Sequence, residues 1–295
     1  MKGLLNISIL VLASLALQAQ SNFEAFRFME SHSLHQAKLA ISQLEDDSLK
    51  AISKKQLKLW AVENLQNEVM FKHTHSLVDN STPWTETRLG VKLKNGDHTS
   101  VISVAQAQRF QQSGNQMDLD HYWEASNSFY FNGNFNLGSN NLFPVWGAGA
   151  GVYFTGIKKT ELGLGYRYSK FSNTAVQMRI ASLTYYPKGM YINVKYFNVK
   201  SGNGISHAVM GEARSYLHNG FGYLLLRVAA GTEVDRLANA AGALTSNSIG
   251  AGINYRLSPR WSAELTLSAE QQAISENLSR NLTTLNLSLN YHFAK

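Results

Sequence analysis

The chain has 295 residues and a formal net charge of +7, with 44% hydrophobic residues but only 16% charged residues. Ordinary soluble domains carry about 25% charged residues, yet the mean hydropathy of −0.21 is too low for a bundle of membrane helices. The sequence contains no cysteine, which excludes disulfide scaffolds, thiolate metal sites and cysteine nucleophiles.

Residues 1–20 are typical of a secretory signal peptide. Lys2 provides a basic start, residues 4–17 form a largely apolar run, and small residues around Ala19 suit cleavage. The apolar run is shorter than the ~20 residues that a membrane helix needs. The sequence therefore predicts export across the inner membrane.

Residues 21–83 are predicted to form two or three short periplasmic helices. From Leu34 to Val69, apolar residues recur at spacings that place them on one side of a helix. These helices could bind a periplasmic protein partner. His73 and His75 form an H-x-H pair in this segment, but a pair without a third ligand is a weak metal signal, so we expect no metal site.

Residues 84–295 alternate between apolar and polar side chains. Leu162, Leu164 and Tyr166 share one face of a strand, whereas Glu161 and Arg167 share the other. Turn signals such as Asn-Gly separate these stretches. About twelve strands are predicted, near residues 84–94, 99–112, 117–137, 145–155, 160–171, 174–186, 189–200, 206–217, 220–231, 244–257, 260–273 and 281–293.

This pattern favours an all-β fold, an antiparallel transmembrane β-barrel, over a soluble sandwich. Charge and glycine lie on the polar face, and the strands have the roughly ten residues with which a tilted strand crosses a membrane. Aromatic residues also gather near strand ends, as in the girdles at the two membrane interfaces. These are Tyr185, Tyr186, Tyr191, Tyr216, Trp261 and Tyr291. We expect the chain in the outer membrane of a Gram-negative bacterium.

Residues 84–293 resemble the YaiO family of outer-membrane β-barrel proteins. The matching pieces, in order, are Arg109-Phe110, Leu142-Phe143-Pro144, Gly165-Tyr166-Arg167-Tyr168, Tyr186, Tyr191 to Lys195, Ser215-Tyr216 and Gly231. The resemblance implies insertion by the barrel assembly machinery, which recognises a terminal aromatic residue such as Phe293. Helices before a barrel are also similar to the layout of surface-polysaccharide exporters.

Strand parity predicts two sets of charged residues in the lumen. The basic set is Arg88, Lys92, Arg167, Arg179, Lys195, Arg214, Arg227 and Arg256, and the acidic set is Glu86, Glu161, Glu212, Glu264 and Glu270. Because lumen charges tune selectivity, a basic-biased pore would favour anionic or saccharide solutes. Alternatively, the Arg–Glu pairs form a closed network that plugs a structural, scaffolding barrel. Gly147, Gly149 and Gly151 could make room for a pore or for the large neighbouring Arg and Tyr side chains.

A third alternative is a lipid hydrolase on the outer face of the barrel. His98 and Ser100 lie on one face of a strand, but no acidic or amide partner is evident, so we expect no enzyme activity. We also expect no cofactor and no nucleic-acid partner, because the basic residues are dispersed and no recognition motif accompanies them. The expected partners are outer-membrane lipid, the assembly machinery, saccharide or anionic solutes and a periplasmic protein.

Overall fold

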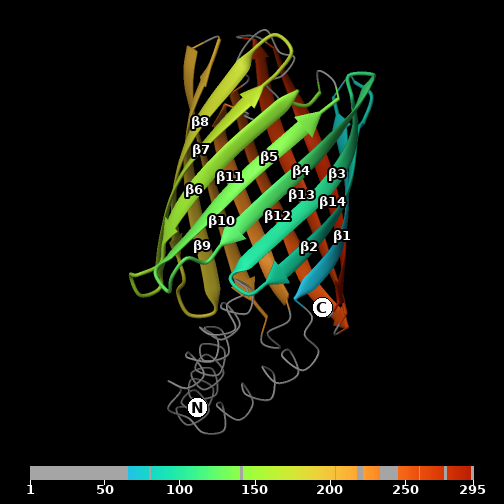
Figure 1. Cartoon of the computed structure of the whole chain (residues 1–295). Helices are drawn as coiled ribbons and strands as arrows, with labels where there is room; N and C mark the ends of the chain where they lie inside the picture. The colour runs from blue at the N-terminus through green and yellow to red at the C-terminus, as the bar shows by residue number, and fades with distance from the viewer. Residues whose placement is uncertain are drawn as a thin grey trace, which may run out of the picture.

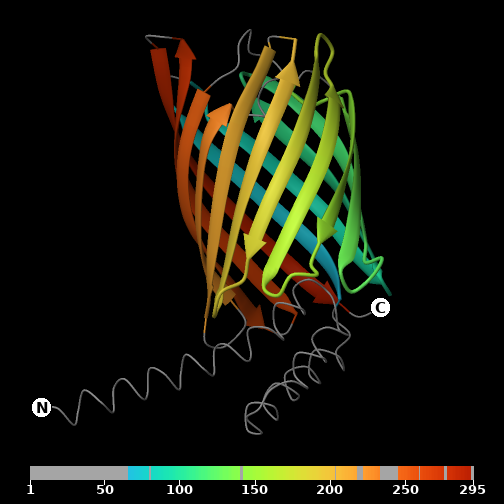
Figure 2. The same ribbon diagram turned by 90° about the vertical axis from the view of Figure 1, so that its left-hand side faces the viewer.

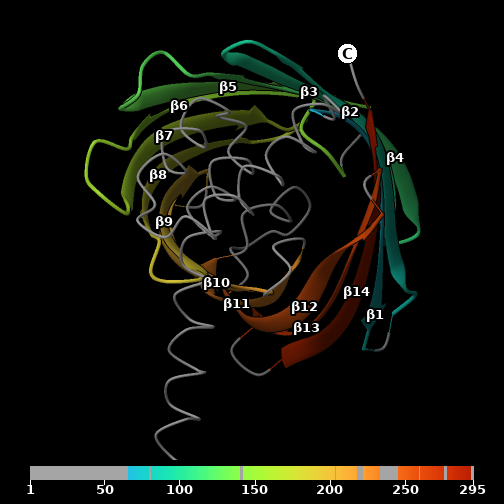
Figure 3. The ribbon, with the colours of Figure 1, turned by 90° about the horizontal axis from the view of Figure 1, so that it is seen from below.

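A computed structural model describes residues 66–79, 81–139, 142–202, 204–217, 222–232, 245–258, 260–275 and 278–293. In these residues, fourteen antiparallel strands close into one barrel (Figure 1), which forms a ring when viewed from below (Figure 3). In chain order the strands are β1 (Asn67–Val78), β2 (Trp84–Asn95), β3 (His98–Arg109), β4 (Gln112–Trp123), β5 (Phe129–Gly138), β6 (Trp146–Phe154), β7 (Thr160–Lys170), β8 (Ala175–Tyr185), β9 (Met190–Ser201), β10 (Gly204–Tyr216), β11 (Gly222–Thr232), β12 (Thr245–Ser258), β13 (Trp261–Ser275) and β14 (Leu278–Phe293).

The barrel closes between its first and last strands. Asn67 of β1 lies opposite Phe293 of β14, and the pairing continues to Val78 opposite Leu282. All other strands pair with their sequence neighbours, so each strand has a partner on both sides, as lipid requires. The even strand number places the start of β1 and the end of β14 at one end (Figure 2), which we call the terminal end. The opposite end is the loop end.

The outer face of the barrel is apolar. Leu89, Leu164 and Leu267 have exposed fractions of 53%, 64% and 56%. Such side chains alternate along the strands with polar residues on the inner face. A continuous apolar surface around a closed barrel indicates contact with lipid. No helix in the described ranges is long and apolar enough to cross a membrane.

The predicted count of about twelve strands is two too low. One missed strand comes from residues 117–137, for which the sequence predicts a single strand and which form parts of β4 and β5. Residues 124–128 separate them in a turn, where the Ser126 hydroxyl accepts hydrogen bonds from the backbone N–H groups of Ser128 and Phe129, at 3.2 and 3.1 Å. A hydroxyl-capped turn of this kind lacks the Gly or Pro signal on which the prediction of turns relied.

The other missed strand is β1, which lies within the segment predicted to be helical. Its outward positions include Val69, Phe71 and Leu77, but His73 and His75 interrupt the apolar run between them. Those two residues obscured the period of two. Pairing with both β2 and β14 stabilises β1 as a strand. The predicted signal peptide and the predicted helices before residue 66 lie outside the described residues.

Apolar clusters lie inside the barrel towards the loop end. One contains Phe171, Val176, Met178 and Val199, and a second contains Ala107, Leu142 and Phe143. The second forms because residues 142–144, between β5 and β6, fold onto the inner face of β3. The lumen is therefore polar along much of its length but locally apolar near the loop end.

Candidate functional site

The barrel lumen is the candidate site, and most of the predicted lumen residues lie on inward positions. The alternation of exposure along each strand places the following side chains inside: Glu86, Arg88, Lys92, Glu161, Arg167, Lys195, Glu212, Arg214, Arg227, Arg256, Glu264 and Glu270. Their positions follow from strand parity, because successive side chains of a strand point to opposite sides.

Arg179 is the exception, and its predicted lumen position is wrong. The register of β8 places it beside Tyr166 and Asn198 on the outer face. The inner face of β8 instead carries Val176 and Met178, which belong to an interior apolar cluster. In this part of β8 apolar residues face the lumen and not lipid. The prediction for Arg179 is wrong because it assumed the opposite.

An ion-pair network occupies the lumen towards the loop end. Glu86 pairs with Arg88 at 3.3 Å and with Arg109 at 3.0 Å. Arg88 also pairs with Asp118 and donates a hydrogen bond to the Ser103 hydroxyl at 3.0 Å. Arg109 and Asp118 were outside the predicted charged sets. Arg109 is the last residue of β3 and lies next to a two-residue turn, so the alternation along the strand did not predict the face on which its side chain lies.

A cavity of about 320 Å³ adjoins this network. Arg167 and Asp120 line it on one side, and Leu142 and Phe143 line it on another. Leu142 and Phe143 are both buried. The cavity is therefore a polar chamber with an apolar wall formed by the inward-folded residues 142–144.

A second ion-pair network lies towards the terminal end. Glu212 accepts hydrogen bonds from the Nε atoms of Arg214 and Arg227, at 2.8 and 2.9 Å. The Arg214 guanidinium also lies 4.8 Å from the ring centres of both Tyr191 and Tyr223, which is cation–π geometry. Glu212 is 7% exposed, whereas the Arg227 side chain is 49% exposed to the lumen.

Two lumen cations differ from the paired ones. In the portion that the structure describes, the side chains of Arg167 and Lys195 make no hydrogen bond and no ion pair within 4 Å. Arg88, Lys92, Arg214 and Arg227 each have a carboxylate partner. The predicted basic stripe is therefore partly neutralised by ion pairs, and the two cations without an ion-pair partner within 4 Å lie on β7 and β9.

The three glycines of β6 make room for asparagine side chains. Gly147, Gly149 and Gly151 lie opposite Asn136, Asn134 and Asn132 of β5. A Cβ atom on Gly149 would lie 2.9 Å from both side-chain polar atoms of Asn134 and 2.8 Å from a backbone oxygen. Side chains therefore occupy this space and not a pore, but the residues opposite the glycines are asparagines and not the large arginines and tyrosines that were predicted.

Only part of the predicted aromatic girdle faces lipid. Tyr185 and Trp261 point outward, with exposed fractions of 47% and 42%. Tyr186, Tyr191 and Tyr216 point into the lumen, since Tyr186 donates to Glu161 at 3.3 Å, Tyr191 contacts Arg214, and Tyr216 contacts Tyr223 at 5.7 Å between ring centres. The prediction that these three tyrosines belong to the girdle rested on their position at strand ends, and it is wrong.

The outer face carries a serine–histidine cluster that includes a residue missed in the sequence. The Ser100 hydroxyl lies 2.9 Å from Nδ1 of His121, and Nε2 of His121 lies 3.2 Å from Nδ1 of His98. His121 joins the cluster through strand pairing, because it lies opposite Ser100 in the register of β3 and β4.

The other histidine pair, His73 and His75, lies on the outer face of β1, and His73 contacts the Thr87 hydroxyl at 2.9 Å. No group of three metal-binding side chains occurs within the described ranges.

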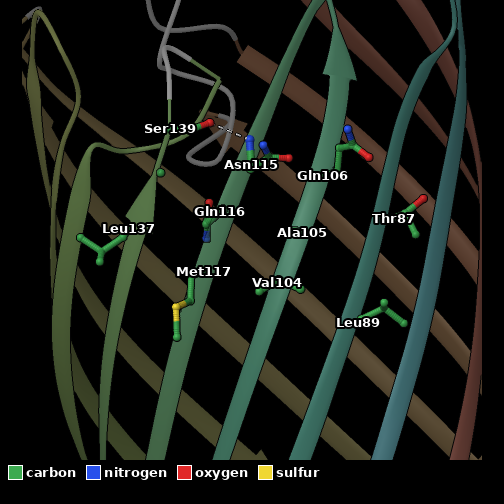
Figure 4. Close-up of a pocket in the computed structure, with 11 residues that line it drawn as sticks. Thr87, Leu89, Val104, Ala105, Gln106, Asn115, Gln116, Met117, Leu137 and Ser139 are labelled. Carbon is green, nitrogen blue, oxygen red and sulfur yellow. Dashed lines mark hydrogen bonds between the residues drawn. The ribbon is translucent and has the colours of Figure 1, made fainter.

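A groove of about 480 Å³ also lies on the outer face, across β2 to β5 (Figure 4). Leu89, Val104 and Met117 line it, and the Ser139 hydroxyl closes one edge by accepting the Asn115 backbone N–H at 2.9 Å. Because these leucine, valine and methionine side chains are on the lipid-facing side, the groove belongs to the lipid-contacting surface and not to the lumen.

Comparison with known proteins identifies both a family and a fold. The model of the "YaiO membrane beta barrel domain" matches residues 66–236. Together with the closed barrel and its apolar outer face, this match places the chain in the outer membrane of a Gram-negative bacterium. A search of curated proteins gave no match.

Solved structures share the fold at low sequence identity. The "CymD monoaromatic hydrocarbon channel" is 8% identical, with a TM-score of 0.58 over 81% of this chain and 92% of that one. A "Bacterial polysaccharide outer membrane secretin" is 10% identical, with a TM-score of 0.52 over 79% of this chain and 99% of that one. Identities this low establish a common architecture and leave the solute to be argued from the lumen.

Proposed function

Because this chain belongs to the YaiO membrane beta barrel domain family, we propose that it forms a conduit across the outer membrane for saccharides or anionic solutes. The observation that carries the proposal is the pair of lumen cations without a direct ion-pair partner, Arg167 and Lys195, inside a closed barrel. Fixed positive charges along a pore raise the local concentration of anions. The structure that resembles this barrel and is described as a polysaccharide secretin supports, by analogy, a role in surface-polysaccharide export.

The terminal end is proposed to face the periplasm. The two consecutive strands with the most residues between them, β11, which ends at Thr232, and β12, which begins at Thr245, meet at the opposite end. Outer-membrane barrels carry their long loops outside the cell and their short turns in the periplasm. In this orientation the segment before β1 emerges in the periplasm, where it could bind a protein partner, and β14 presents Phe293 to the assembly machinery.

Ion selectivity tests the conduit directly. Folded protein in a planar bilayer should carry an anion-preferring current, measured as a reversal potential across a KCl gradient. Replacing Arg167 and Lys195 by Gln should shift that potential towards cations. Arg179→Gln removes the same charge from the outer face and should leave it unchanged.

The alternative is a scaffold barrel with a plugged lumen. The Glu86 and Glu212 networks and the inward-folded residues 142–144 support it, since they fill the interior. Absence of current through protein that shows heat-modifiable migration on gels would refute the conduit and favour the scaffold.

A second candidate function, a lipid hydrolase, is favoured by one contact, the 2.9 Å approach of the Ser100 hydroxyl to His121. Histidine could accept the serine proton during attack on a lipid ester, and His98 would orient it. A neutral histidine stabilises the resulting imidazolium less than a carboxylate does, so we rank this function below the conduit. Fatty-acid release from phospholipid vesicles that is lost in Ser100→Ala would establish it, and equal release from both proteins would exclude it.

A further inference from the structure

Seven tyrosine side chains line the lumen at the terminal end. They come from β4, β5, β6, β9, β10 and β11 and from the residue after β8. We call them the tyrosine arc: Tyr122, Tyr130, Tyr153, Tyr186, Tyr191, Tyr216 and Tyr223. The arc covers one side of the barrel mouth. Away from the arc, the mouth carries charged and polar groups that include Glu68 and His292.

Ring contacts join neighbouring members of the arc. Tyr130 and Tyr153 lie opposite each other in register and stack with ring centres 4.4 Å apart and planes inclined by 3°. Tyr186 and Tyr191 meet edge to face at 5.6 Å. These contacts hold the rings in fixed orientations, so a ligand would meet a preformed aromatic surface.

The membrane interface does not account for this arc. The outward girdle at the same end is formed by other residues, such as Trp123, Phe129 and Tyr185, with exposed fractions of 47%, 43% and 47%. Each of the three is next in sequence to an arc member, and strand alternation turns the two to opposite sides. The tyrosine arc is therefore a second set of aromatic residues at the level of the girdle, and it faces the lumen, where it can contact a solute.

Hydrogen-bonding groups are interleaved with the rings. Glu161 accepts the Tyr186 hydroxyl at 3.3 Å, and Glu264 accepts the Tyr223 hydroxyl at 2.8 Å. Arg214 lies between the rings of Tyr191 and Tyr223. The mouth thus combines flat aromatic faces with carboxylate and guanidinium groups within a few ångströms.

We propose that the tyrosine arc is a saccharide-binding surface at the periplasmic mouth of the barrel. The axial C–H bonds of a pyranose ring carry partial positive charge and pack on the negative face of an aromatic ring. The sugar hydroxyls can exchange hydrogen bonds with carboxylate, guanidinium and phenol groups. An aromatic hydrocarbon could stack on the same rings but could exchange no hydrogen bonds with those polar groups, which favours a sugar over it.

The accessibility of Tyr122 argues that the arc is more than packing. Tyr122 is 36% exposed, although it faces the inside of the barrel. A ring that only filled the lumen would be enclosed by its neighbours. Tyr122 therefore offers accessible side-chain surface inside the barrel that a sugar could contact.

This inference rests on the proposed conduit, because it names the solute class that enters the lumen. The test uses the full chain in a planar bilayer with maltohexaose, a neutral chain of six glucose rings, added to each side in turn. We expect maltohexaose to block the ion current, and Tyr122→Leu to weaken the block about 2- to 10-fold, the range for loss of one aromatic contact. Tyr153→Leu should act in the same direction.

Two variants separate stacking from structure. Tyr122→Phe keeps the ring and should keep most of the block, whereas Tyr185→Leu removes an outward tyrosine at the same level and should leave the block unchanged. Equal weakening by Tyr185→Leu, or none by Tyr122→Leu, would overturn the saccharide surface. Heat-modifiable migration on gels shows that each variant is folded.

The two proposals fail in different ways. A current that maltohexaose does not block refutes the saccharide surface and leaves the conduit standing. If the wild-type protein carries no current, the conduit fails, and calorimetric titration of maltohexaose into the detergent-solubilised protein decides on the arc alone. In that titration, absence of binding refutes the arc, and binding weakened by Tyr122→Leu supports it.

Discussion

Replacing Glu212 by Gln should destabilise the barrel and increase its preference for anions. The carboxylate is almost fully buried and serves two arginines, Arg214 and Arg227. Glutamine has nearly the same shape, so it keeps the packing and removes only the charge. It leaves two cations facing each other without the anion between them.

The magnitude follows from the exposure of the two partners. A hydrogen bond to a charged group contributes about 1.5–3 kcal/mol, and the Arg214 side chain is 27% exposed, so the loss there should lie near the lower limit, about 1.5–2 kcal/mol. The Arg227 side chain is 49% exposed, and solvent screening reduces its pair to less than about 1 kcal/mol. We therefore expect a loss of about 2–3 kcal/mol.

The assay is equilibrium unfolding by urea in lipid vesicles, followed by tryptophan fluorescence. Arg227→Gln serves as a comparison, because it removes the weaker pair and leaves Glu212 with Arg214. It should cost less than the glutamate variant. A loss below about 1 kcal/mol for Glu212→Gln, or a larger loss for Arg227→Gln, would refute the argument that the buried carboxylate organises this part of the lumen.

Three further outcomes are expected from substitutions at other sites. Gly149→Ala should cost about 1–3 kcal/mol in urea unfolding because its Cβ would meet Asn atoms at 2.9 Å, whereas Gly133→Ala, where nothing lies within 4 Å, should cost little; equal costs would contradict the asparagine–glycine packing. Leu267→Arg, on the outer face, should cost about 2–4 kcal/mol in vesicles, and Ser268→Arg, on the inner face, should cost less; the reverse order would contradict the assigned faces. Phe143→Ala should widen the loop end and raise single-channel conductance, and an unchanged conductance would show that residues 142–144 do not constrict the lumen.

Much of the fold follows from the sequence because lipid imposes a simple alternation. Leu162 and Leu164 face outward as expected, and the predicted strand around them coincides with β7. The alternation fails where the two sides of a strand are chemically alike. His73 and His75 place polar residues on the outer face of β1, and Met178 places an apolar residue on the inner face of β8, which misplaced Arg179.

The candidate site was less accessible from sequence than the fold. Parity predicts that a side chain faces the lumen, but pairing between strands decides which charges meet. Asp118 and Arg88 are brought together by the register of β2, β3 and β4, and His121 reaches Ser100 in the same way. Single-sequence reasoning supplies the faces of strands and not their register, so these contacts required the structure.

The seam between β1 and β14 has a consequence for how the chain reaches its native state. Asn67 and Phe293, which meet there, are separated by nearly the whole described sequence. Bringing such distant segments together carries the entropic cost of closing a very long loop, and the contact forms only when the last strand is available. The family match ends at residue 236, before β12. A fragment ending there would expose two unpaired strand edges to lipid. The three remaining strands, β12 to β14, are therefore as necessary for insertion as the strands that the family match covers.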